Sequence, residues 1–206
     1  MALTIYGDLI SGNCLKVKWT ADRLGIAYEW IPVDVGAGGA QTAEFRRLNS
    51  AAQVPTVVLE DGRSLAQSAA IIIHLAEGSE LIPADPYPRA KMFEWLFWEQ
   101  YSHEPYIAVR RWQKLQGKAD EALDPNLLVR GNAALARMES WLAGSPYLVD
   151  GKLPLADIAL VAYTRMAHQG GFDLSQFPAT KAWIARVESE LGLAPLYPCC
   201  HGRAPV

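Results

Sequence analysis

Hydrophobic and polar residues change their spacing along the chain, and this change divides it into two parts. The first part alternates short β-rich runs with helical patterns. Residues 3–6 and 27–33 read as strands, and the apolar positions within 12–24 fit one side of a helix that Gly25 ends. A strand, a helical crossover and a second strand predict a parallel βαβ unit.

A hairpin and two more helices complete this first part. A Gly-rich loop at 36–39 leads to a short helix at 42–48, and the β-rich runs 55–59 and 63–65 flank Asp61-Gly62. Asp-Gly between two short strands is a strong hairpin signal. With a last helix at 67–76, the order predicts an open-faced sheet with helices on both sides.

The second part has helical patterns and no convincing strand. A linker at 78–88 contains three prolines. It is followed by helical patterns at 89–117, 126–142, 155–169 and 180–191, and Pro105 should kink the first of them. We therefore predict an α/β domain over residues 1–78 and an all-α domain over residues 88–206.

Composition narrows the class of protein. The 206 residues are 50% hydrophobic and 20% charged with a net charge of −3, which is typical of a globular protein and gives no basic patch for nucleic acid. No apolar run reaches the roughly 18–20 residues of a membrane span, and the N-terminus lacks the pattern of a signal peptide. A cytoplasmic protein is expected. The cysteines Cys14, Cys199 and Cys200 form neither a disulfide framework nor a metal-binding spacing, so no metal is expected.

Four local motifs occur in order on the predicted elements. Together they resemble the cytosolic glutathione transferase family over about residues 2–191, in a serine-type, theta- or nu-like form. The motifs are Ser11-Gly12-Asn13-Cys14, Gln53-Val54-Pro55-Thr56, Gln67-Ser68 and Leu155-Ala156-Asp157. The resemblance implies a thioredoxin-like glutathione-binding domain, a helical domain that contributes the electrophile site and dimer contacts, and a homodimer.

Ser11 is the expected catalytic residue. It precedes a helix whose unpaired N–H groups and partial positive charge would stabilise a thiolate, and its hydroxyl could donate a hydrogen bond to the sulfur. A free thiol has a pKa of about 8.5, so such an environment raises the thiolate fraction at neutral pH. Asn13 is a second candidate donor. The alternative is that Ser11 is an ordinary N-cap.

The resemblance also assigns the residues that would hold glutathione. In the family the proline at Pro55 is cis, and the backbone of Val54 meets the cysteinyl part of the peptide. Gln67 and Ser68 open a helix whose N-terminus favours the γ-glutamyl carboxylate. Gln53 could reach the glycyl carboxylate.

Several positions depart from the family pattern. Gln67 replaces an acidic residue, Gln41 stands where a lysine is common, and residues 49–52 read Asn-Ser-Ala-Ala instead of Asn-Pro-x-Gly. Pro154 takes the place of the Ser or Thr that would pair with Asp157 in a capping box. These changes should affect glutathione affinity more than the fold.

The stretch 93–112 is rich in aromatic residues and is the expected wall of the electrophile site. Tyr106 and Arg110 are four residues apart and share a helix face, so we predict that they contact a small, largely apolar electrophile.

Three other functions remain open from the sequence. Cys14 could form a mixed disulfide with glutathione, as in disulfide reductases of this fold. The early Ser-x-x-Cys with Gln67-Ser68 loosely resembles the maleylpyruvate and maleylacetoacetate isomerases. A non-catalytic interaction module of the same fold is the third.

Overall fold

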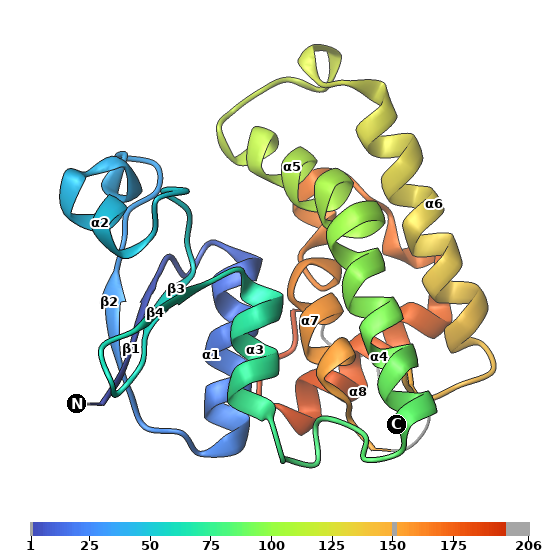
Figure 1. Ribbon diagram of the computed structural model, residues 1–206. Coiled ribbons are helices and arrows are strands. Elements are labelled where there is room, and N and C mark those ends of the chain that lie inside the picture. Colours follow the sequence, from blue (N-terminus) through green and yellow to red (C-terminus); the bar gives the residue numbers. More distant parts are fainter. Residues whose placement is uncertain (1, 150–151, 197–206) are drawn as a thin grey trace, which may run out of the picture.

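A computed structural model describes residues 2–149 and 152–196, so Cys199 and Cys200 lie outside the described residues. A four-stranded sheet forms the first part (Figure 1). Its strands are β1 (Leu3–Gly7), β2 (Tyr28–Pro32), β3 (Thr56–Val58) and β4 (Ser64–Ala66), in the order β2-β1-β3-β4. β1 and β2 are parallel, whereas β3 is antiparallel to β1 and β4, which confirms the predicted βαβ unit and hairpin.

Three helices cover the two faces of this sheet. α1 (Gly12–Leu24) and α3 (Ser68–Ala76) lie between the sheet and the second part of the chain, and α2 (Ala43–Leu48) lies away from it (Figure 1). The alternation of β1 buries Leu3 and Ile5 against α1 and α3. Phe45 of α2 packs in a separate small cluster with Val33 and Ala40.

The second part is helical, and no strand follows β4 within the described residues. Its helices are α4 (Pro86–Trp98), α5 (Glu104–Leu115), α6 (Pro125–Leu142), α7 (Leu155–Thr164) and α8 (Pro178–Glu190). The thioredoxin-like sheet followed by a helical domain confirms the predicted fold class. Asp85 and Asp124 begin α4 and α6 by accepting a backbone N–H two residues on.

The predicted long helix 89–117 is interrupted. α4 and α5 are joined by a π-helical segment, Glu99–His103, that ends just before Pro105. A proline inside a regular α-helix lacks an N–H and clashes with the preceding turn. Here Pro105 lies in the first turn of α5, so the wider turn takes the place of the expected kink.

α7 is the central helix of the molecule. All of its residues are buried, and α1, α3, α4, α5 and α8 contact it. Asp157 in its first turn accepts the backbone N–H of Leu148 and the indole N–H of Trp183 in α8. Asp157 therefore acts without a capping-box partner at Pro154 and ties α7 to the preceding loop and to α8.

Candidate active site

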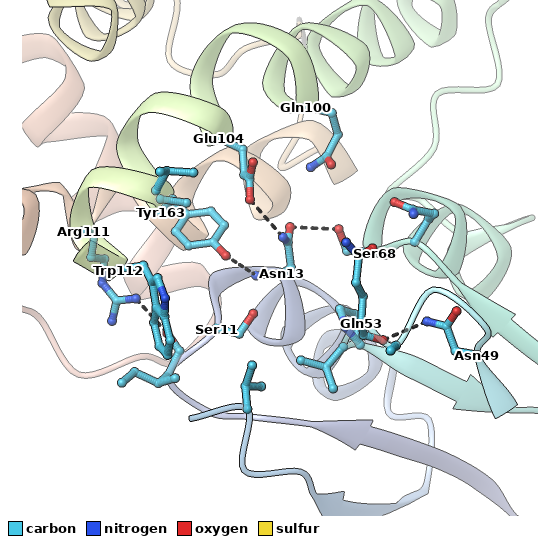
Figure 2. A pocket seen from close by; sticks show the side chains of 18 of the residues that line it. Ser11, Asn13, Asn49, Gln53, Ser68, Gln100, Glu104, Arg111, Trp112 and Tyr163 are labelled. Carbon is cyan, nitrogen blue, oxygen red and sulfur yellow. Dashed lines mark hydrogen bonds between the residues drawn. The ribbon is translucent and has the colours of Figure 1, made fainter. Parts of the chain in front are cut away.

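A cavity of about 700 Å³ lies between the two parts of the chain. Figure 2 shows its lining side chains, with Ser11 just before α1 and Asn13 in α1 facing Glu104, Arg111 and Trp112 from α5. The lining also includes the predicted binding residues, namely Gln53, Val54, Pro55, Gln67 and Ser68. Motifs that are far apart in the sequence therefore meet at one site.

Ser11 occupies the N-cap position of α1, but its side chain makes no capping hydrogen bond. The hydroxyl is thus not used by the helix, in contrast to an ordinary N-cap serine. It interacts instead with the Tyr163 phenol and the Cys14 thiol. Ser11 is half-buried and lines the cavity, so its hydroxyl can reach a bound thiol.

Cys14 points away from this cavity. Its side chain is fully buried, and its sulfur accepts the backbone N–H of Asp8 at 3.4 Å. Burial raises the pKa of the Cys14 thiol to about 11. A reactive cysteine needs an exposed position and a lowered pKa. The geometry therefore favours Ser11 over Cys14.

Asn13 connects three helices beneath the cavity. Its Oδ1 accepts from Lys16 Nζ at 2.7 Å and from Ser68 Oγ at 3.0 Å, and its Nδ2 donates to Glu104 at 3.3 Å. Burial raises the pKa of the Glu104 carboxyl. Asn13 thus holds Ser68 of α3 and Glu104 of α5 in fixed positions around Ser11.

The loop before β3 supplies backbone groups. The Val54–Pro55 peptide bond is cis, as the resemblance implies. Asn49 holds the loop by donating to the Gln53 carbonyl at 2.8 Å and to Thr56 Oγ1 at 3.1 Å. Val54 is half-buried and lines the cavity.

Gln67 and Ser68 mark the start of α3 at the cavity. Gln67 has φ 70°, ψ 114°, and its side chain does not cap the helix. The first N–H groups of an α-helix have no partner within the helix. The start of α3 can therefore bind a carboxylate. Gln41, by contrast, is exposed, does not line the cavity and accepts from Arg46.

The opposite wall is a different face of α5 from the one predicted. Glu104, Ala108, Arg111 and Trp112 line the cavity, whereas Tyr106 and Arg110 do not. The Tyr106 hydroxyl accepts from Arg130. Arg110 is buried, donates to the Gly170 carbonyl and forms an ion pair with Asp120 at 2.6 Å. At about 100° per residue, Tyr106 and Arg110 lie nearly opposite the face formed by these four residues, while Val109 and Gln113 also line the cavity.

Tyr163 of α7 completes the site and was not identified from the sequence. Its hydroxyl accepts the backbone N–H of Asn13 at 3.3 Å. Burial and the nearby Glu104 charge raise the pKa of the phenol, so it stays protonated. A Cβ on Gly12 would lie 2.7 Å from the Tyr163 ring. The glycine of the first motif therefore allows α1 and α7 to approach closely, a requirement that no local pattern reveals.

Buried charges lie behind the site. Lys16 Nζ contacts Glu99 Oε1 at 2.7 Å, and both side chains are 1% exposed. His103 is also buried, and burial lowers its pKa to about 3, so it is neutral. Within residues 2–149 and 152–196, no group of three or more acidic, His or Cys side chains could hold a metal ion. No helix in these ranges is long and apolar enough to cross a membrane.

A thioredoxin-like sheet, a cis-proline loop and a serine at a helix start, all facing a helical domain, define a class of thiol-binding protein. The sequence matches the families described as "Glutathione S-transferase, N-terminal domain" over residues 10–77 and "Glutathione S-transferase, C-terminal domain" over residues 92–190. The chain belongs to the glutathione S-transferase family.

Solved structures and curated proteins agree with this assignment. A glutathione S-transferase from Pseudomonas fluorescens is 45% identical with a TM-score of 0.89, over 92% of this chain and 96% of the other. One from Xanthobacter autotrophicus is 42% identical with a TM-score of 0.87, over 95% and 96%. Glutathione S-transferase theta-1 of Mus musculus is 28% identical over 93% of this chain and 85% of its own length.

Proposed function

We propose that the chain conjugates glutathione to small electrophiles and that Ser11 stabilises the reacting thiolate. The observation that carries the proposal concerns the Ser11 side chain. It lines the cavity at the positive end of α1, and it makes no capping hydrogen bond to the helix. A hydrogen-bond donor that points at an anion stabilises it more in a site without water than it would in water.

The peptide would lie along the residues of the first domain. The N-terminus of α3, with Gln67 and Ser68, would bind the γ-glutamyl carboxylate, and the backbone of Val54 would pair with the cysteinyl residue. Gln53 would contact the glycyl carboxylate. Neither Gln67 nor Gln41 carries a charge, which supports a modest affinity for the peptide.

The reaction is a nucleophilic substitution or addition at an electrophilic carbon. With a chloronitroaromatic compound, the thiol loses its proton to water and the thiolate forms the C–S bond. Chloride then leaves with the electron pair of the broken C–Cl bond. Ser11 would lower the thiol pKa in the bound state, and Asn13 would keep Ser68 in place. A homodimer and a cytoplasmic location are part of the proposal and rest on membership of the family.

The test compares wild type, Ser11→Ala and Cys14→Ala with 1-chloro-2,4-dinitrobenzene. We expect Ser11→Ala to lower kcat by about a hundredfold, because one donor to the anion is lost. Ultraviolet titration of bound glutathione should then show a higher thiol pKa. Cys14→Ala should keep near wild-type kcat, because the buried thiol does not line the cavity.

Other outcomes would favour other functions. Loss of activity only in Cys14→Ala, together with disulfide reductase activity in wild type, would replace this mechanism with a cysteine-based one. A wild-type protein that glutathione does not stabilise against heat, and that has no activity, would instead indicate an interaction module.

A further inference from the structure

Arg111 is a buried cation in the wall of the cavity, without a carboxylate partner among the described residues. Its side chain is 5% exposed. Nε donates to Gln169 Oε1 at 2.7 Å and Nη1 donates to the Ile10 carbonyl at 2.8 Å, but both acceptors are neutral. Buried arginines are normally paired with an acid because burying an isolated charge is costly.

The contrast with Arg110 is informative. That neighbour is equally buried, points away from the cavity and has Asp120 as its ion partner. Arg111 instead donates to two neutral acceptors, although its guanidinium has five N–H donors in all. Its Nη2 has no acceptor within residues 2–149 and 152–196, and Arg111 lines the cavity, so unused N–H donors are available to a ligand.

The surroundings of Arg111 limit what could bind there. Trp112, Ala108 and Ile10 add apolar surface beside it. Glu104 lies on the same wall about two helical turns from Arg111, and its carboxylate would repel an anion that bound close to it. The contact with the Ile10 carbonyl places the guanidinium next to the residue that precedes Ser11. An anionic group on Arg111 would therefore lie near the reacting centre and away from Glu104.

We propose that Arg111 determines specificity for electrophiles that combine an aromatic or apolar body with an oxyanion such as a carboxylate or sulfonate. The inference rests on the proposed transferase function and names its substrate class. The planar guanidinium would form a paired hydrogen bond with the oxyanion, and Trp112 would contact the apolar body. This interaction would orient the electrophilic carbon toward the thiolate at Ser11.

The experiment uses two matched electrophiles, 4-chloro-3-nitrobenzoate and the neutral 4-chloro-3-nitrobenzamide. Because the two differ in intrinsic reactivity, the measured quantity is the ratio of their kcat/KM values in each variant relative to that ratio in wild type. We expect Arg111→Gln to lower this relative ratio at least about tenfold, and Arg111→Lys to lower it less. Arg130→Gln, which removes an exposed cation outside the cavity, should leave it unchanged.

A second measurement on wild type does not depend on the folding of a variant. 4-Nitrobenzoate should inhibit competitively against the electrophile at least about tenfold more strongly than 4-nitrobenzamide. Equal inhibition by the two compounds would overturn the proposal. So would an unchanged ratio in Arg111→Gln, or a rise in the glutathione KM with equal losses for both electrophiles, which would assign Arg111 to the peptide.

The outcomes also separate this proposal from the proposed function. Conjugation of the neutral amide that depends on Ser11 supports the transferase whatever Arg111 does. If wild type conjugates neither electrophile and does not bind glutathione, both proposals fail.

Discussion

At the scale of single residues, two positions beside the cavity have a positive φ although neither is glycine. Ala52 has φ 53° and Gln67 has φ 70°. For an L-residue, the left-handed region costs roughly 1–2 kcal/mol relative to ordinary helical or extended backbone. Ala52 stands where the family pattern has glycine, so the departure seen in the sequence corresponds to a strained residue in the loop before Val54.

The first prediction concerns this loop. Replacing Ala52 with Gly removes the strain but adds freedom to the unfolded chain and deletes a buried methyl group, so the free energy of unfolding should change by less than about 0.5 kcal/mol. Ala51→Gly, at an exposed position with ordinary φ, should lose about 0.5–1 kcal/mol. Urea unfolding of both variants measures the difference. Equal losses would show that Ala52 is unstrained.

The sequence identified one wall of the cavity but not the other. Ser11, Asn13, Val54 and Ser68 lie next to turns or helix starts, where short motifs carry positional information. Arg111 lies in mid-helix beside Arg110, and the two have the same local pattern. Which of them faces the cavity depends on how α5 is rotated, and that is set by packing of distant segments.

At the scale of elements, Asp157 links three segments through one buried carboxyl. It accepts N–H groups from Leu148 and Trp183, and burial raises its pKa from 3.8 to about 8. A carboxyl whose pKa is higher in the folded than in the unfolded chain favours folding most strongly below pH 4. That contribution is lost progressively as the pH rises toward 8.

The second prediction compares wild type with Asp157→Asn at two pH values. Asn keeps one acceptor oxygen but does not titrate, so only wild type should lose stability through Asp157 between pH 5 and pH 8. The cost of the substitution should therefore be smaller at pH 8 than at pH 5, by more than about 1 kcal/mol. Urea unfolding at each pH measures it. The same cost at both values would mean that folding leaves the pKa of Asp157 unchanged.

Most elements followed from the sequence because their ends carry local signals. Gly25 ends α1 with φ 65°, and Thr42 caps α2 by accepting from Phe45. The π-helical segment had no such signal. Pro105 predicts that the regular helix is interrupted, but either a kink or a π turn would be such an interruption. Which of the two forms depends on the burial of Glu99 and His103 against α1 and α7.

At the scale of the whole molecule, the ion pair between Lys16 of α1 and Glu99 joins the two domains. Both side chains are buried, and Lys16 also donates to Asn13. Removal of one member of a buried pair leaves the other charge uncompensated, whereas removal of both costs much less. The pair thus couples the integrity of the site to the packing of one domain on the other.

The third prediction is a double-mutant cycle on this pair. Lys16→Met should lower the free energy of unfolding by about 3–5 kcal/mol, and adding Glu99→Gln should restore part of that loss. Urea unfolding of the single and double variants gives the coupling. If the double variant is less stable than Lys16→Met alone, the charges are not coupled as the geometry indicates.

The π-helical segment is a place where the chain can lose one residue without changing which side chains of α5 line the cavity. A π turn contains about one more residue than an α turn, so deleting a residue within Glu99–His103 would convert it to a regular α turn and leave the residues after it facing almost the same way. Arg111 and Trp112 would then stay in the cavity, whereas a deletion within α5 between Pro105 and Arg111 would turn both by about 100°. A codon lost within this segment would therefore preserve this wall of the cavity, whereas a codon lost within α5 would replace that wall while the glutathione side stays intact.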